Sequence, residues 1–135
     1  METFKHRHPI QVRFNDVDQM GHINNAVIME YFDLGKSRYF QDSHVPVRPE
    51  EGDFTVMIVH YEVDFIGQLH ADDAIEVCTK LEKIGNKSLT ILQHIQVNGI
   101  PKVVCHTVMA GYSRSQAASA VIPEEVKSSL IAFES

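Results

Sequence analysis

Residues 15–25, NDVDQMGHINN, bring together side chains that could carry out acid–base or nucleophilic chemistry. They include two carboxylates, Asp16 and Asp18, followed by a glycine, His22 and the pair Asn24 and Asn25. A carboxylate can act as a general base or as a nucleophile, and either role needs donors that stabilise the developing negative charge. The unpaired N–H groups at the start of a helix supply such donors. The segment is therefore either an elaborate helix cap or a reaction centre that uses the helix.

A helical pattern begins immediately after this segment. From residue 25 to about residue 43, apolar side chains recur at the i, i+3, i+4 spacing of an amphipathic helix, and two prolines then end it. Asp18 precedes Asn25 by seven residues, so we expect it near the positive end of the helix dipole, which favours its ionised form. Asn24 or Asn25 can cap this helix and leave other first-turn N–H groups free to face a ligand.

The rest of the sequence predicts long antiparallel strands and a short terminal helix. Apolar and polar side chains alternate along the strands, and Asn98-Gly99 is a strong hairpin signal. Pro123 followed by two glutamates is typical of a helix start. The predicted strands are a first one ending at residues 10–14, then 54–65, 73–84, 87–97 and 100 to about 114. The order is β-α-β-β-β-β-α, an α+β class in which a curled antiparallel sheet wraps the long helix.

The strand at residues 54–65 has a polar and an apolar face. Apolar side chains at every second position from Met57 to Phe65 are expected on one face. His60 and the acidic residues at 62 and 64 are expected on the other, which is either a solvated surface or a contact for substrate across a dimer. Because long strands leave sheet edges that must be protected, we expect edge-to-edge homodimers, with a further pairing into a tetramer left open.

Length, composition and charge exclude several classes of protein. A chain of 135 residues predicts a single domain spanning residues 1–135. No apolar run approaches the ~20 residues of a membrane helix, and the first residues lack the apolar stretch of a signal peptide. We therefore expect a cytoplasmic protein with no membrane partner. A net charge of −6 opposes a nucleic-acid partner.

Cysteine and histidine spacing does not indicate a metal centre. Cys78 and Cys105 lie inside strand-like runs without CxxC spacing, so we expect reduced thiols in the core. The eight histidines lack HxxxH or HExxH spacing, and no metal is predicted.

Together these features resemble hotdog-fold acyl-CoA thioesterases of the 4-hydroxybenzoyl-CoA thioesterase type. The resemblance is carried by the pattern DxDxxGHxNN at residues 16–25, by the following Tyr31-Phe32 pair, and by softer matches along nearly the whole chain. The softer matches are at residues 63–66, 73–77, 85–89, 98–99 and 122–124. The resemblance implies the hotdog fold and hydrolysis of an acyl-CoA thioester to a free acid and CoA. It implies no cofactor, since CoA is part of the substrate.

The resemblance also implies roles for individual residues. Asp18 occupies the family's catalytic carboxylate position, where it either attacks the thioester carbonyl to give a mixed anhydride or activates a water. The backbone N–H of Asn25 would stabilise the oxyanion, and Gly21 would let the loop approach the thioester closely. His22 is a candidate for polarising water or orienting Asp18. Asn24 is expected to cap the helix beside the substrate.

This sequence departs from the family at positions that limit the transfer. Phe14 and Met20 stand where some relatives carry tyrosine and asparagine, and Asn25 stands where one bacterial subgroup carries histidine. Basic residues that such relatives carry near positions 67 and 70 are absent, which leaves the CoA phosphates unassigned. His60 and Arg114 are the remaining candidate substrate contacts, Arg114 as a phosphate ligand.

Two alternative functions stay open at this point. One is a thioesterase that acts on acyl-acyl-carrier protein, which the chain's acidic balance disfavours mildly because carrier proteins are also acidic. The other is a non-catalytic hotdog module that binds acyl-CoA. Hydration of a double bond is a third reaction known in this fold, but the motif at residues 16–25 does not resemble that subgroup.

Overall fold

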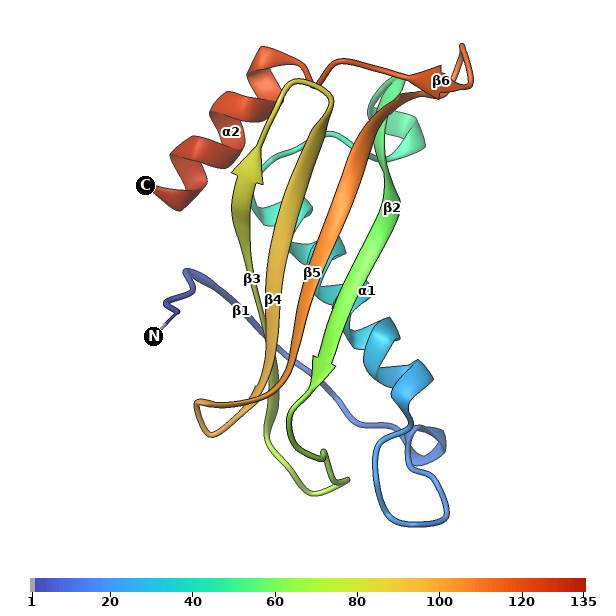
Figure 1. The fold of residues 1–135 in the computed structure, drawn as a ribbon, viewed down its shortest axis with the longest axis vertical. Helices are drawn as coiled ribbons and strands as arrows, with labels where there is room; N and C mark the ends of the chain where they lie inside the picture. The colour runs from blue at the N-terminus through green and yellow to red at the C-terminus, as the bar shows by residue number, and fades with distance from the viewer. Residues whose placement is uncertain (1) are drawn as a thin grey trace.

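The computed structural model describes residues 2–135 and shows a long helix packed against one antiparallel sheet (Figure 1). Helix α1 covers Asn25–Asp42 and α2 covers Glu124–Glu134. Single 3-10 turns occur at Phe14–Asp16 and Pro49–Glu51. The strands are β1 His6–Pro9, β2 Phe54–Phe65, β3 Ile75–Ile84, β4 Ser88–Val97, β5 Ile100–Ser113 and β6 Ala118–Ser119.

The sheet is antiparallel throughout, with the strand order β1-β3-β4-β5-β2, and β6 pairs with β5 beyond this path. Figure 1 shows the long strands curling past α1, so that the helix lies in the hollow of a half-barrel. This is the predicted hotdog fold. Among residues 2–135, strand β2 pairs only with β5, so its other side is a long free edge of the sheet.

Helix α1 buries one continuous face against the sheet. Its buried residues follow the predicted helical spacing. The first half of the helix packs into one cluster of core side chains and the second half into another. The helix packs tightly against the sheet at Gly35, where an added Cβ would lie 2.7 Å from Cγ2 of Val77. Only glycine allows this approach, so Gly35 fixes how deeply α1 sits in the sheet.

The predicted helices and the four long strands are confirmed, but the start of the chain differs from the prediction. The first strand ends at Pro9, and residues 10–13 are not part of any strand. The Asp16 side chain accepts a hydrogen bond from the backbone N–H of Arg13 at 2.9 Å. This contact turns the chain into a 3-10 helix instead of continuing the strand. The two-residue strand β6 was not predicted, because so short a segment has no detectable alternation.

A β-bulge in β2 corrects the predicted faces of that strand. The register with β5 shifts between Ile58 and His60, so Val59 is the extra residue. Beyond the bulge, Tyr61 and Phe65 oppose buried β5 residues, as alternation predicts. Before the bulge the phase reverses, so Met57 opposes Ala110 on the outer face and is not on the face of Phe65. Alternation alone cannot reveal the inserted residue.

The two cysteines lie in the core. Cys78 and Cys105 are free, fully buried thiols, as predicted, and burial raises the pKa of Cys78 to about 11. Neither thiol is therefore a nucleophile at neutral pH. No helix among residues 2–135 is long and apolar enough to cross a membrane.

Candidate functional site

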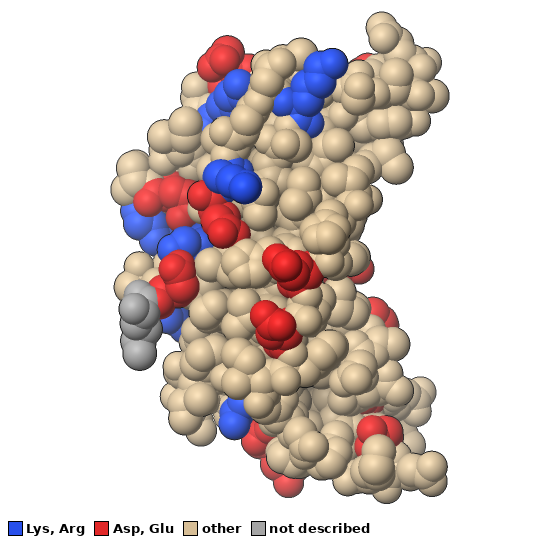
Figure 2. Space-filling view, viewed as in Figure 1, with Lys and Arg blue, Asp and Glu red and all other residues tan. Residues whose placement is uncertain are grey.

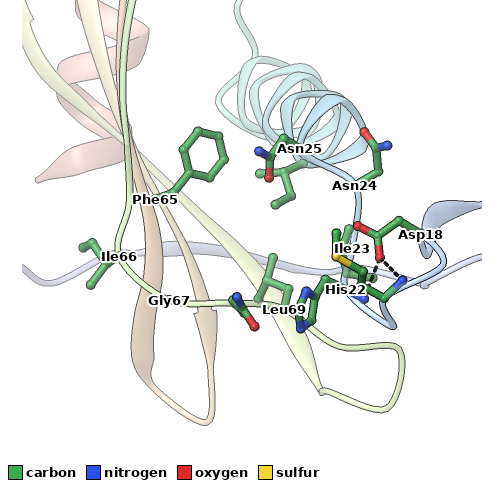
Figure 3. Close-up of a pocket in the computed structure, with 12 residues that line it drawn as sticks. Asp18, His22, Ile23, Asn24, Asn25, Phe65, Ile66, Gly67 and Leu69 are labelled. Atoms are coloured by element: carbon green, nitrogen blue, oxygen red, sulfur yellow. Dashed lines mark hydrogen bonds between the residues drawn. The ribbon is translucent and has the colours of Figure 1, made fainter.

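Residues 18–22 form a tight turn that fixes one oxygen of Asp18. The backbone N–H of Asp18 donates to the carbonyl of His22 at 2.8 Å, and Gly21 adopts a φ of +84°, which favours glycine. Asp18 Oδ1 accepts hydrogen bonds from the backbone N–H groups of Met20 at 2.9 Å and His22 at 3.1 Å (Figure 3). Within residues 2–135, Oδ2 accepts no hydrogen bond. The turn thus holds the carboxylate in place and leaves one oxygen available for chemistry.

The start of α1 lies beside this carboxylate and is capped by Asn24. Asn24 Oδ1 accepts a hydrogen bond from the N–H of Ala26 at 2.8 Å, which satisfies one of the donors of the first turn. The N–H of Asn25 has no acceptor among the described residues and remains a free donor at the positive end of the helix dipole. The predicted cap at Asn24 is confirmed, and it leaves the Asn25 N–H group exposed as expected.

A pocket of about 560 Å³ opens between this turn, the start of α1 and the segment after β2 (Figure 3). Asp18 and Asn25 both line it, as do His22 and Asn24. Figure 3 shows Phe65 projecting from the end of β2 toward the helix start. The lining also includes apolar residues that are almost fully buried in the core, namely Ile23, Ile28 and Leu69. The pocket therefore joins one polar corner to an apolar wall.

His22 is held beside a second histidine that sequence reasoning missed. His22 and His70 form an isolated antiparallel bridge, and their rings pack edge to face with centroids 5.2 Å apart. Asp73 fixes His70 by accepting its backbone N–H at 2.8 Å and by approaching its Nδ1 at 3.5 Å. The two histidines are far apart in sequence, so no local signal reveals the pair.

Asp16 is buried and anchors the segment that precedes the turn. Its side chain is 1% exposed and accepts hydrogen bonds from the hydroxyl of Tyr31 at 2.7 Å and from Nε of Arg13 at 3.2 Å. Burial alone would raise the pKa of Asp16, but the hydrogen bonds from the Arg13 backbone, Tyr31 and the Arg13 guanidinium lower it overall. Asp16 therefore stays ionised and ties the 3-10 turn to α1.

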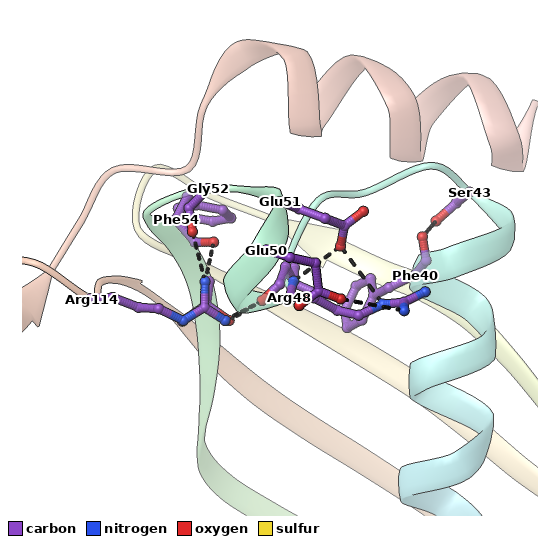
Figure 4. Close-up of polar contacts among 10 residues, drawn as sticks. Phe40, Ser43, Arg48, Glu50, Glu51, Gly52, Phe54 and Arg114 are labelled. Carbon is purple, nitrogen blue, oxygen red and sulfur yellow. Dashed lines mark hydrogen bonds and ion pairs between the residues drawn. The ribbon is translucent and has the colours of Figure 1, made fainter.

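The structure does not bring Arg114 or His60 into this pocket. Arg114 lies beside the start of β2, the opposite end of that strand from Phe65, and donates to the carbonyl oxygens of Gly52 at 2.9 Å and of Val47 (Figure 4). Its guanidinium thus braces the chain before β2. His60 lies beside the bulge on the outer face of β2, opposite Val108. Within residues 2–135, no group of three or more histidine, cysteine or acidic side chains could hold a metal ion.

Comparison with known proteins places the chain in a family. The sequence model of the thioesterase-like superfamily matches residues 12–130 of this chain. The matched region includes both the turn at residues 18–22 and the start of α1. The chain belongs to the thioesterase-like superfamily. The sequence-based assignment is thereby confirmed at the level of the superfamily, while membership of the 4-hydroxybenzoyl-CoA type stays a prediction.

Individual relatives of this superfamily member agree with that placement. It is similar to a thioesterase from Thermus thermophilus whose crystal structure contains coenzyme A and Zn, with 31% identity, a TM-score of 0.83, and 99% of this chain and 97% of that chain covered. A 1,4-dihydroxy-2-naphthoyl-CoA thioesterase from Synechocystis shares the fold, with a TM-score of 0.83, 15% identity, and 96% and 97% covered. An uncharacterized Bacillus subtilis protein, YsmA, is 24% identical over 96% of this chain and 87% of its own length.

Proposed function

We propose that this protein hydrolyses an acyl-CoA thioester to a free acid and CoA. One observation supports the proposal most directly: Asp18, with one carboxylate oxygen that accepts no hydrogen bond within residues 2–135, and Asn25, whose N–H has no acceptor there, line the same pocket. A thioester is already an activated acyl group, so its hydrolysis needs little more than a base or nucleophile and a donor for the oxyanion. The superfamily and its CoA-bound relative support the same chemistry.

In this proposal the thioester carbonyl points its oxygen at the Asn25 N–H group and its carbon toward Asp18. Asp18 either takes a proton from a water that attacks the carbonyl carbon, or attacks that carbon itself to give a mixed anhydride that water then hydrolyses. In both routes the carbon–sulfur bond breaks, and the thiolate of CoA leaves. The N–H of Asn25 stabilises the negative charge that develops on the carbonyl oxygen, aided by the dipole of α1.

His22 orients this reaction in the proposal and does not replace Asp18. The backbone N–H of His22 donates to Asp18, so the residue already fixes the carboxylate through its main chain. Its ring lines the pocket and packs on His70. From this position the His22 side chain is placed to polarise the attacking water.

We further propose that the protein acts as a homodimer joined along β2. Within residues 2–135 this strand pairs only with β5, so its other edge is free, and Val59 in its bulge is 61% exposed. Figure 2 shows that most of the charged side chains in this view gather over β3 and α2, with a few acidic side chains nearer β2, where Glu62 and Asp64 are exposed. Pairing of two β2 strands would satisfy the backbone hydrogen-bonding groups of both edges and cover Val59.

The function is tested by incubating the purified protein with a panel of acyl- and aryl-CoA thioesters and measuring free thiol. We expect release of CoA from at least one member of the panel at a rate proportional to enzyme concentration. Binding of the panel without turnover would contradict hydrolysis and indicate an acyl-CoA-binding module. Turnover of acyl-acyl-carrier protein alone would contradict CoA as the thiol.

A further inference from the structure

A second hollow adjoins the pocket described above at Asp18. Its volume is about 550 Å³, and its walls are formed mainly by Val12, Phe14, Val17 and Ala71. Asp18 lines both hollows, so they meet at this residue. The Phe14 side chain is 97% exposed in this hollow. So large an exposed aromatic surface is typical of a residue that contacts a ligand or partner.

A thioester substrate needs two hollows with this relation to the carboxylate. The acyl group and the sulfur arm leave the carbonyl carbon in different directions, and the reacting carboxylate must reach the carbon between them. The first pocket reaches buried core residues such as Ile28 and Leu69, which suits an apolar acyl group. The shallower second hollow, with its exposed aromatic wall, then suits the amide-bearing pantetheine arm.

A third hollow adjoins the second at Arg13 and is lined by basic side chains. It lies between β1 and α1, and it shares Arg13 with the second hollow in the same way that the second shares Asp18 with the first. Arg13, Arg38 and His8 line it together with a single acid, Glu30. Arg38 forms no ion pair within residues 2–135.

Arg13 is held in a fixed position by a buried carboxylate. Its Nε and Nη2 both lie within 3.2 Å of Asp16 Oδ1, and Asp16 is in turn held by the Tyr31 hydroxyl at 2.7 Å. The Arg13 side chain is nevertheless 65% exposed, and Nη1 forms no hydrogen bond within the described residues. Glu30 approaches the guanidinium only to 3.9 Å. A guanidinium with one edge anchored and one edge free is well suited to bind a phosphate.

We propose that the three hollows form one track for an acyl-CoA, in which the second holds the pantetheine arm and Arg13 and Arg38 bind its phosphates in the third. This inference rests on the proposed function and names the residues that recognise the thiol half of the substrate. It assigns Phe14 to the pantetheine arm and gives the buried Asp16 a positioning role, since Asp16 holds Arg13 in place.

The test compares substrates that carry the same acyl group on three thiols: CoA, pantetheine without phosphate, and N-acetylcysteamine, which lacks most of the arm. Arg13→Gln and Arg38→Gln are expected to raise KM for acyl-CoA about tenfold each, the usual effect of one charge-assisted hydrogen bond, with KM for acyl-pantetheine unchanged. Phe14→Ala is expected to raise KM for acyl-CoA and acyl-pantetheine but not for the N-acetylcysteamine thioester. KM does not depend on the fraction of folded enzyme, so partial unfolding of Arg13→Gln would not imitate this pattern.

Arg48→Gln is the matched control. Arg48 begins the other 3-10 turn and pairs with an acid three residues later, as Arg13 does, but it lies far from Asp18 beside Arg114 (Figure 4). We expect it to leave all three KM values unchanged. Equal KM values for acyl-CoA in Arg13→Gln, Arg38→Gln and the parent would overturn the track, even if hydrolysis itself were intact.

Direct binding separates this inference from the proposed function. Isothermal titration of CoA into the parent protein and the two arginine variants needs no turnover. We expect about tenfold weaker binding of CoA by Arg13→Gln and by Arg38→Gln. If no thioester is hydrolysed but CoA binding still depends on both arginines, the proposed reaction fails and the track stands. If CoA binds equally well to all three proteins, the track fails.

Discussion

At the scale of single residues, two neighbouring aspartates of similar sequence context have opposite environments. Asp18 is fixed by two backbone N–H groups and keeps one oxygen free, whereas Asp16 is buried and satisfied by Arg13 and Tyr31. The sequence pattern places both acids before the helix, but only the three-dimensional contacts distinguish the reactive carboxylate from the anchoring one.

The anchoring role of Asp16 predicts how stability depends on pH. The pKa of Asp16 is lowered in the folded protein, so its ionised side chain stabilises the fold at pH values above the unfolded pKa of about 3.9. This stabilisation is lost as the pH falls through the pKa of Asp16 in the folded protein. We expect Asp16→Asn to lower the free energy of unfolding by about 1–3 kcal/mol at neutral pH, and to flatten the loss of stability at acid pH. Urea unfolding at a series of pH values measures both effects.

The control for this prediction is Asp72→Asn. Asp72 is exposed and forms no hydrogen bond or ion pair within residues 2–135. Its substitution should leave the pH profile of stability close to that of the parent. A profile for Asp16→Asn that parallels the parent down to acid pH would show that Asp16 does not anchor the turn through its charge.

At the scale of elements, the start of α1 combines a structural cap with the proposed oxyanion donor. Asn24 binds the Ala26 N–H group and thereby holds the first turn in which Asn25 presents its own N–H group. We expect Asn24→Ala to lower the free energy of unfolding by about 1 kcal/mol. It should also reduce kcat, because a frayed first turn no longer holds the Asn25 donor in place.

Asn24→Ser is the informative companion to that variant. Serine caps helices about as well as asparagine, so stability and kcat should both return toward the parent values. Thermal unfolding and steady-state kinetics measure the two properties on the same samples. Recovery of stability without recovery of kcat would show that the amide of Asn24 contacts the substrate directly.

Sequence reasoning succeeded for elements whose periodicity is long and failed where one residue changes the pattern. Helix α1 and the long strands repeat the same apolar spacing over ten or more residues, and their positions were predicted closely. The bulge at Val59 inserts one residue into β2 and reverses the faces before it. Likewise, the hydrogen bond from the Arg13 N–H to the Asp16 side chain begins a 3-10 turn, and the first strand ends earlier than the apolar pattern suggests.

The candidate site shows the same limit. The segment at residues 18–25 was predicted because its functional groups are close in sequence and border a helix. His70 and the wall at Phe65 and Leu69 come from a distant segment that tertiary contacts bring to the turn, such as the bond from the Ile23 N–H to the Leu69 carbonyl at 2.8 Å. Arg114 is predicted as a phosphate contact from its place near the end of the last strand, and in the structure its guanidinium donates to the carbonyl oxygens of Gly52 and Val47.

At the scale of the whole molecule, the free edge of β2 predicts self-association. The parent chain of 15.3 kDa should sediment at about twice that mass or a multiple of it. Val59 is 61% exposed on this edge, and Val59→Lys should shift the protein toward the monomer, because a lysine on an edge strand opposes pairing with another edge. Analytical ultracentrifugation at several concentrations measures this shift.

The matched control is Ile131→Lys on α2, which replaces an apolar residue of similar exposure, 57%, away from β2. It should leave the sedimenting mass unchanged. A monomeric parent, or a dimer that Ile131→Lys disrupts and Val59→Lys does not, would contradict association through β2.

The most direct test of the central claim is the rate of thiol release by Asp18→Asn. Asparagine keeps the size of the side chain and its Oδ1 acceptor for the Met20 and His22 N–H groups, but it can act neither as base nor as nucleophile. We expect kcat to fall by about 10²–10⁴-fold, with an unchanged melting temperature and with Asp72→Asn as active as the parent. A rate for Asp18→Asn equal to that of the parent would contradict the account.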